Sequence, residues 1–161
     1  MSFSIIAAIG EKNELGKKGG LCFDIPGDLK FFKEVTMGHP VFMGLNTWRS
    51  LPGKLPGREH YVLVFDAKDV EGEGVNAVTD LDGFISEWKD SDTEIFVIGG
   101  GMVYKQMLPH ASKMYLTEVH ASDAEAEVFF PEFDKSEWNK EIIREGGDHD
   151  LTYSHVLYTR K

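Results

Sequence analysis

Asp28 is an acidic residue on an otherwise apolar helical face. Phe31, Phe32 and Val35 follow it after three, four and seven residues, which places all four on one side of a helix. An unpaired buried carboxylate is very costly, so Asp28 would need hydrogen-bond donors, and a planar ligand with two adjacent N–H groups would satisfy both oxygens. The alternative is structural, because Pro26 suits a helix start and the helix dipole favours an acid in the first turn.

Two glycine turns follow segments that are typical of strands. Residues 96–98 lead into Gly99–Gly101, and residues 41–43 lead into Gly44, with Thr47 one turn later. Backbone N–H groups at a helix start attract phosphate, and glycine lets the phosphate approach closely. The two turns could hold the two ends of a pyrophosphate, or they could be ordinary tight turns that need a positive φ.

Arg58 and Thr117 each allow a functional and a structural interpretation. Arg58 could offer a two-pronged donor to a ligand carboxylate, or it could be a solvated loop arginine. The hydroxyl of Thr117 could bridge a buried carboxylate and a ligand, or the residue could be present for its β propensity. Cys22 is the single cysteine and is interpreted as a packing residue. The six histidines show no metal-ligand spacing, so we expect no metal.

The elements that must position these residues alternate between strand and helix. The predicted strands are Ser4–Ile9, Pro40–Gly44, Tyr61–Phe65, Val75–Val78, Glu94–Ile98, Lys113–Val119, Trp138–Arg144 and Leu151–Thr159. The predicted helices are Pro26–Met37, Leu45–Leu51, Leu81–Lys89 and a segment that ends at Leu108. The predicted loops are Asn13–Gly20, Leu51–Arg58 and the polar connection Glu145–Asp150.

This alternation predicts one α/β domain over residues 1–161. Strand-helix-strand units give right-handed crossovers and a mainly parallel sheet, whereas the final strand pair gives an antiparallel edge. We expect a mixed sheet of about eight strands flanked by about four helices. Such sheets bind ligands beyond the carboxyl ends of their strands, which here lie near Ala8, Gly44, Phe65, Gly99 and Thr117.

Composition and charge limit the classes of partner. A chain of 161 residues with 42% hydrophobic residues can bury a core. The net charge of −10 argues against nucleic acid, which needs a basic surface. No apolar run approaches the ~18 residues of a membrane span, and the start resembles a strand more than a signal peptide. A single cysteine and the lack of heptads lead us to expect a cytoplasmic monomer.

The motifs, taken together and in order, resemble the dihydrofolate reductase family over nearly the whole chain. The most specific pieces are Ile25-Pro26-Gly27-Asp28-Leu29 with Phe31-Phe32, Met43-Gly44 with Thr47-Trp48, Leu55-Pro56-Gly57-Arg58, Ile98-Gly99-Gly100-Gly101 with Val103-Tyr104, Tyr115-Leu116-Thr117, and Phe130-Pro131. Any one of them is a weak signal, but six in register are a strong one. The resemblance implies that family's fold and the NADPH-dependent reduction of 7,8-dihydrofolate to 5,6,7,8-tetrahydrofolate.

The same resemblance implies roles for the substrate site. Asp28 would hold the pterin's N3 and 2-amino group with the help of Thr117, and Arg58 would hold the α-carboxylate of the glutamate tail. Catalytic roles would fall to Asp28, Thr117, Leu21 and Phe23, with water as the source of the N5 proton. The slot would be walled by Ile6, Ala8, Leu29, Phe32, Leu51, Leu55 and Ile98.

The resemblance also implies a cofactor site. The nicotinamide would lie near Ala8, Ile98 and Tyr104, and a mobile loop over Asn13–Leu21 would close over it and exclude water. The family's cis peptide bond corresponds to Gly99-Gly100. The implied cofactor-binding residues are Ala8, Leu15, Gly16, Leu21, Gly44, Leu45, Asn46, Thr47, Val64, Phe65, Ile98, Gly100, Gly101, Met102, Val103 and Tyr104.

The expected 2′-phosphate site departs from the family pattern. Members that favour the phosphorylated cofactor usually place cations or hydroxyls there, whereas this chain has Leu45, Phe65 and Met102. NADPH is expected, with Lys68 as a nearby cation, but NADH is an alternative.

The expected mobile loop departs from the pattern as well. Cys22 and Phe23 stand where the family often has Pro-Trp, and Ala126 stands where some relatives have glycine in the loop that contacts the mobile segment. Loop closure and water access near N5 could therefore differ from those of relatives.

Two other functions compete with this assignment. A riboflavin-pathway reductase on the same fold would keep the glycine turn but would not need the pair Asp28 and Arg58. A catalytically silent nucleotide-binding module would keep both glycine turns and lack turnover.

Overall fold

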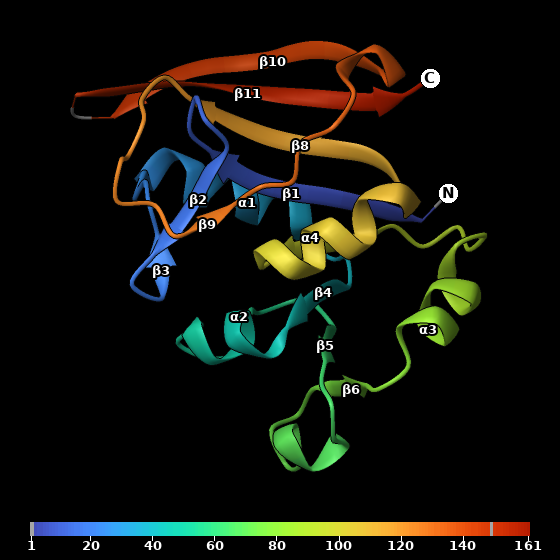
Figure 1. The fold of residues 1–161 in the computed structure, drawn as a ribbon. Helices are drawn as coiled ribbons and strands as arrows, with labels where there is room; N and C mark the ends of the chain where they lie inside the picture. The colour runs from blue at the N-terminus through green and yellow to red at the C-terminus, as the bar shows by residue number, and fades with distance from the viewer. Residues whose placement is uncertain (1, 149) are drawn as a thin grey trace.

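The computed structural model describes residues 2–148 and 150–161, and these form a main sheet and a small second sheet (Figure 1). The main sheet has eight strands in the order β10-β11-β8-β1-β7-β4-β5-β6. Their bounds are Phe3–Ile9 (β1), Val41–Gly44 (β4), His60–Leu63 (β5), Asn76–Val78 (β6), Ile95–Gly99 (β7), Ala111–Val119 (β8), Trp138–Asp148 (β10) and Leu151–Arg160 (β11). The second sheet has the order β3-β2-β9, with bounds Glu14–Lys17 (β2), Gly20–Leu21 (β3) and Val128–Phe129 (β9).

Four α-helices and three short 3₁₀ turns connect the strands in the described part of the chain. The helices are Pro26–Thr36 (α1), Leu45–Ser50 (α2), Leu81–Trp88 (α3) and Gly101–Met107 (α4). The 3₁₀ turns are Ala67–Val70 (η1), Leu108–His110 (η2) and Lys135–Glu137 (η3).

The helices cover both faces of the main sheet. Residues of α3 and α4 share one apolar cluster with Phe42 and Val97, whereas residues of α1 and α2 share another with Met43 and Phe96. Neighbouring residues of β4 and β7 therefore point to opposite faces, as the two-residue period of a strand requires. Burial on both faces explains why these strands are continuous apolar runs.

The predicted α/β architecture is confirmed. β1 pairs in parallel with β7 and β8, and β4, β5 and β6 continue the parallel part. β11 pairs antiparallel with both β8 and β10, which forms the predicted edge. The sheet places the carboxyl ends of β1, β4 and β7 next to one another, because these strands are parallel neighbours.

Two predicted loops are wrong in part. Asn13–Gly20 is not a plain loop, because β2 lies within it and pairs with β3 and with β9, more than a hundred residues away. The connection Glu145–Asp150 is also wrong in part, because β10 continues to Asp148 and β11 begins at Leu151. His149, in that connection, lies outside the described residues. In both places the backbone ladder forms strands that are too polar to be recognised from apolar alternation.

The start of α1 positions the acidic residue singled out from the sequence. Pro26 occupies the beginning of the helix, and Asp28 lies in its first turn, where its N–H donates to Ile25 O at 2.9 Å. Phe31, three residues later, is buried. The helix start and the apolar face both predicted for Asp28 are therefore present.

Candidate active site

The carboxylate of Asp28 is bound to the sheet by a hydroxyl group of β8. Thr117 Oγ1 donates a hydrogen bond to Asp28 Oδ1, and the Asp28 side chain is 20% exposed. Burial raises the pKa of Asp28, and the hydrogen bond from Thr117 opposes that rise without cancelling it. A mostly buried acid of this kind gains stability from a ligand that donates N–H groups to it.

A buried histidine lies behind this pair. His155 is the register partner of Thr117 across β11 and β8, and its Nδ1 is 3.0 Å from Thr117 Oγ1 and 3.9 Å from Asp28 Oδ1. Its ring stacks on Phe31 of α1 with a centroid separation of 3.8 Å. Three elements thus meet at one short row of polar atoms.

The predicted substrate walls range from residues packed in an apolar cluster to one that is exposed. Ile6, Phe32, Leu51 and Ile98 all belong to the apolar cluster on the α1–α2 face. Ala8 is the register partner of Thr117 across β1 and β8, which places it beside the acidic pair. Leu55 is half-buried, and Leu29, next to Asp28 on α1, is exposed.

Arg58 is fixed between its own loop and the end of α1. Its Nε donates to Pro56 O and its Nη1 to Thr36 Oγ1, both at 3.0 Å. A guanidinium has five N–H donors, so these two bonds can orient the group while other donors stay free to bind a carboxylate. Partial burial lowers the pKa of Arg58, but from so high a value that the group stays charged.

The two glycine turns meet at one corner of the sheet. Met43 of β4 is the register partner of Gly99 of β7, and the Gly99-Gly100 peptide bond is cis, as the resemblance implied. A Cβ atom at Gly99 would lie 3.4 Å from Thr47 Oγ1, and one at Gly100 would lie 3.5 Å from it. Glycine backbone and a hydroxyl group thus face one another where adjacent parallel strands end.

Close packing of the following helix also depends on glycine. A Cβ at Gly44 would lie 3.1 Å from Val103 Cγ2, and one at Gly101 would lie 2.7 Å from Val128 Cγ1. These contacts seat α4 against β4 and β9. The corner fits a phosphorylated dinucleotide, because glycine turns that lead from a strand into a helix are where open α/β sheets hold phosphate.

Tyr104 connects the glycine corner with the acidic site. Its hydroxyl donates to Ile6 O at 2.7 Å and lies 3.4 Å from the position of a Cβ at Gly99. Burial raises the pKa of Tyr104 strongly, and the charge of Asp28 adds to that rise. Tyr104 thus links β1 to the glycine corner, and Asp28 lies near enough to act on it electrostatically.

The remaining predicted cofactor residues range from buried to fully exposed. Val64 is buried and Leu45 is half-buried, and both belong to the α1–α2 cluster. Asn46 is exposed. The side chains of Phe65 and Met102 are 100% and 72% exposed, which leaves apolar surface at the positions expected near the 2′-phosphate.

The predicted mobile loop is anchored at one end by a buried carboxylate. Glu14 is 1% exposed and accepts hydrogen bonds from the backbone N–H groups of Lys12 at 2.7 Å and Asp123 at 2.6 Å. Burial alone would raise the pKa of Glu14, but these hydrogen bonds lower it below its ordinary value. Leu15 and Gly16, the next residues, are also buried.

The other end of that loop is more open. Leu21 is 61% exposed, whereas Phe23 is buried in a small cluster with Ile25, Val119 and Tyr153. The predicted catalytic residues are therefore not all together, because Asp28 and Thr117 are bonded to each other while Leu21 lies on the surface.

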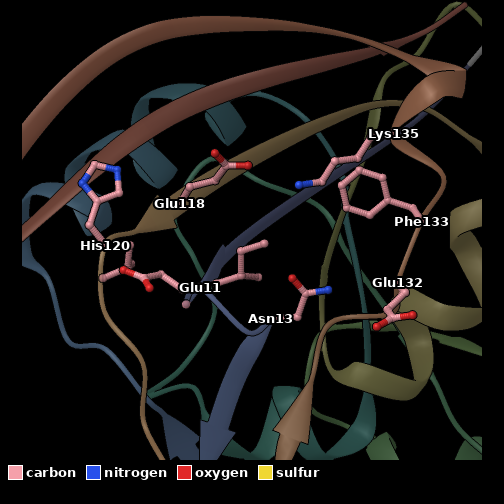
Figure 2. A pocket seen from close by; sticks show the side chains of 10 residues that line it. Glu11, Asn13, Glu118, His120, Glu132, Phe133 and Lys135 are labelled. Atoms are coloured by element: carbon pink, nitrogen blue, oxygen red, sulfur yellow. The ribbon is translucent and has the colours of Figure 1, made fainter.

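A cavity of about 410 Å³ lies outside this candidate site (Figure 2). It is lined by Ile9, Gly10, Glu11, Asn13, Glu118, Val119, His120, Glu132, Phe133 and Lys135. None of the residues predicted for substrate or cofactor lines it. Its carboxylates are Glu11 in the turn after β1, Glu118 of β8 and Glu132 before η3, and its ammonium is that of Lys135 in η3 (Figure 2).

Sequence reasoning did not single out two polar residues of this region, Glu14 and His155. Glu14 lay in a segment predicted to be a loop, and no local pattern marks its distant partner Asp123. His155 lay in a predicted strand, where its place in the chain indicated a strand residue but could not reveal which residue of β8 lies opposite.

Comparison with known proteins agrees with this geometry. The family model described as dihydrofolate reductase matches residues 2–160. The dihydrofolate reductase of Bacillus subtilis is 34% identical over 98% of this chain and 94% of its own length. That of Neisseria gonorrhoeae is 35% identical over 100% of this chain and 99% of its own.

The fold agrees with a solved structure as well. Dihydrofolate reductase from Enterococcus faecalis, complexed with NADP(H) and RAB-propyl, aligns with a TM-score of 0.86 and 30% identity, covering 99% of this chain and 96% of that one. The family model and the relatives match this chain over nearly its whole length, and the acid of α1 and the glycine corner of β7 agree with them. The chain therefore belongs to the dihydrofolate reductase family.

Proposed function

We propose that this protein carries out its family's reaction, the reduction of 7,8-dihydrofolate to 5,6,7,8-tetrahydrofolate, with NADPH as cofactor and Asp28 as the anchor of the pterin. The observation that carries the proposal is the position of the mostly buried Asp28, which is bonded to Thr117 of β8, beside the strand β1 that binds Tyr104 at the glycine corner. A flat heterocycle bound to this acid would lie beside a dinucleotide bound at that corner.

Asp28 would accept hydrogen bonds from the pterin's N3 and 2-amino group. Thr117 already binds Oδ1, so it would fix the plane of the carboxylate and with it the plane of the ring. Charge-assisted hydrogen bonds of this kind are about twice as strong as neutral ones. Ile6, Phe32 and Ile98 would pack against the faces of the ring, since they lie in the adjoining apolar cluster.

Arg58 would bind the α-carboxylate of the substrate's glutamate tail. Its hydrogen bonds to Pro56 and Thr36 hold the guanidinium before the substrate arrives, which reduces the ordering that binding requires. The bound dinucleotide would supply the hydride for pterin C6. The protein would supply position, exclusion of water and the negative charge of Asp28, which favours a protonated ring.

Protonation of pterin N5 would use water. The exposed Leu21 and the buried Phe23 lie at the open end of the predicted mobile loop, so they would control how water reaches N5. Glu14 holds the other end of that loop against Asp123, and this anchor would let residues 18–21 move while β2 stays paired with β9.

NADPH is the cofactor that we propose, although the three residues expected around the 2′-phosphate carry no charge. Leu45, Phe65 and Met102 are uncharged, and Lys68 lies in η1, which closely follows Phe65. Values of kcat/KM with NADPH and with NADH would decide the matter. A clear preference for NADH would contradict this part of the proposal and leave the reaction unchanged.

The assay that tests the reaction follows the absorbance of the reduced nicotinamide with dihydrofolate as substrate. Turnover is expected, together with tight binding of a diaminopyrimidine antifolate. Turnover of a riboflavin-pathway pyrimidine without binding of the antifolate would favour the rival reductase. Dinucleotide binding without turnover of either substrate would favour a silent binding module.

A cytoplasmic monomer without membrane or nucleic-acid partners completes the proposal. Its support is the net charge of −10 and the unpaired Cys22. Within residues 2–148 and 150–161, no helix combines the length and the apolar character that crossing a membrane requires. Light scattering of the purified protein would test the monomeric state.

A further inference from the structure

We propose that His155 is a positioning residue for Asp28, because its Nδ1–H donates a hydrogen bond to Thr117 Oγ1 and so commits the only hydroxyl hydrogen of Thr117 to Asp28. The importance of this role for turnover rests on the proposed function. The arrangement of hydrogen atoms does not, because it follows from the distances among these three side chains.

The assignment follows from counting donors. A threonine hydroxyl has one hydrogen to donate and two lone pairs to accept with. Thr117 Oγ1 donates to Asp28 Oδ1 and lies 3.0 Å from His155 Nδ1. When Asp28 is ionised it can only accept, so the single hydrogen of Thr117 must point to it, and His155 Nδ1 must carry the hydrogen of the second bond.

The surroundings of His155 keep its ring neutral and fixed. The side chain is 2% exposed, and it packs between Phe31 of α1 and Tyr153 of its own strand, with centroid distances of 3.8 and 5.0 Å. Burial and, to a smaller extent, the charge of Arg144 on β10 lower the pKa of His155 to about 4, although Glu34 on α1 opposes that fall. The ring therefore acts as a neutral donor near neutral pH.

The charged groups around His155 come from α1 and β10, whereas β8 contributes the hydroxyl group of Thr117. They are Asp28 and Glu34 of α1 and Arg144 of β10, and Arg144 and Glu34 approach each other to 3.7 Å. This outer ion pair is half-exposed, whereas His155 and Thr117 are buried and Asp28 is mostly buried. The row thus controls the carboxylate without a charged partner.

The direction of the row depends on the charge of Asp28. With Asp28 ionised, hydrogen bonds run from His155 to Thr117 to Asp28. With Asp28 protonated on Oδ1, they can run the other way, from the carboxyl group through Thr117 to an unprotonated Nδ1. The first arrangement stabilises the ionised acid, and removal of its first donor raises the pKa of Asp28 because the hydroxyl is no longer held in place.

Nitrogen NMR of the full chain with labelled histidine tests the arrangement directly. At a pH above the titration of Asp28, His155 is expected to be neutral with the hydrogen on Nδ1, and its signals are identified by their loss in His155→Asn. A hydrogen on Nε2 at that pH would overturn the proposal, because Thr117 would then have to donate to His155. The measurement needs no substrate, so it is independent of the reaction.

Carbon NMR of the Asp28 carboxyl group tests the consequence. His155→Phe keeps a ring against Phe31 but removes the donor, and it is expected to raise the titration midpoint of Asp28 by about one pH unit. His155→Asn places an amide N–H near the position of Nδ1 and is expected to restore a midpoint close to that of the wild type. His120→Phe is the matched control. His120 Nδ1 also lies within hydrogen-bond distance of a threonine hydroxyl, that of Thr152 in β11 at 2.9 Å, but this threonine does not bind Asp28.

The outcomes separate positioning from packing. Equal midpoints in the wild type, His155→Phe and His155→Asn would overturn the proposal, as would equal shifts in both variants. If His155→Phe does not fold, the tautomer of the wild type and the midpoint of His155→Asn still decide it. Failure of the dihydrofolate assay with the expected NMR results would reject the proposed function and leave the role of His155 standing.

Discussion

The carboxylate of Asp28 destabilises the folded protein at neutral pH, because burial raises its pKa above that of the unfolded chain. The folded state therefore binds this proton more tightly. Its contribution to stability is complete below the unfolded pKa and is lost as the pH rises through the folded pKa. A ligand that donates hydrogen bonds to the ionised carboxylate would offset this loss of stability. A buried acid at this position therefore favours the binding of such a ligand.

Asp28→Asn is expected to lower kcat/KM for dihydrofolate roughly a hundredfold or more near neutral pH, since the charge that holds and polarises the pterin is removed. The Kd for the dinucleotide should stay close to that of the wild type, because the glycine corner is unchanged. Steady-state kinetics and cofactor titration by fluorescence check both values. Near-normal turnover would defeat the role assigned to Asp28.

The same substitution is expected to raise the free energy of unfolding by about 1 kcal/mol at pH 8, because a desolvated charge is replaced by a neutral group of the same shape. The gain should shrink as the pH falls and Asp28 becomes protonated. Urea unfolding of both proteins at several pH values measures it. An Asn variant less stable than the wild type at every pH would contradict this explanation.

At the scale of elements, two contacts hold the loops that surround the site. Glu14 connects β2 to the segment at Asp123 through backbone N–H groups, and Gly101 lets α4 approach β9. Both contacts join segments that are far apart in the chain. The first can be weakened by replacing the carboxylate of Glu14 with an amide, and the second by adding one methyl group at Gly101.

Glu14→Gln is expected to lower the free energy of unfolding by about 1–2 kcal/mol, since charge-assisted hydrogen bonds become neutral and one acceptor becomes a donor. Hydrogen bonding lowers the pKa of Glu14 despite its burial, so its stabilising effect should be present at neutral pH and be lost as the pH falls. Urea unfolding against pH tests this. Glu11→Gln, at an exposed residue, is the control and should have little effect.

Gly101→Ala is expected to weaken dinucleotide binding and to destabilise the fold by about 1–3 kcal/mol, because its Cβ would lie 2.7 Å from Val128 Cγ1 and either Val128 or α4 would have to shift. Gly53→Ala is the matched control, since a Cβ there meets nothing within 4 Å. Thermal unfolding with and without NADPH compares them. Equal effects of the two substitutions would show that α4 does not need the close contact.

At the scale of the whole molecule, stability at low pH depends on titratable groups that are buried in their neutral form. His155 has a pKa of about 4 in the folded protein against an ordinary value of 6.5. The unfolded chain therefore binds this proton more readily, and stability falls as the pH drops from about 6.5 to about 4. The net charge of −10 shrinks over the same range.

His155→Phe is expected to reduce the loss of folding stability at low pH. The wild type should lose roughly 2–3 kcal/mol through this one group between pH 7 and pH 4, and the variant should lose correspondingly less. Denaturant unfolding of both proteins across this range gives the difference. Parallel stability curves would show that His155 does not resist protonation in the folded state.

The sequence determined the local features of this protein. Pro26 and the apolar residues after Asp28 were enough to predict α1, and the apolar runs around Phe42 and Val97 were enough to predict buried parallel strands. The order of the elements then predicted the sheet and its antiparallel edge, which are confirmed. The roles of individual site residues, Arg58 and Leu21 among them, stay predictions.

Tertiary structure decided which distant residues meet. Thr117 reaches Asp28 across 89 positions of the chain, and Glu14 reaches Asp123 across 109. Periodicity shows which face a residue occupies, but strand register and helix docking decide its neighbours, and these depend on packing over the whole sheet. For the same reason His155 was only a strand residue in the sequence, and its place behind Thr117 emerged when β11 paired with β8.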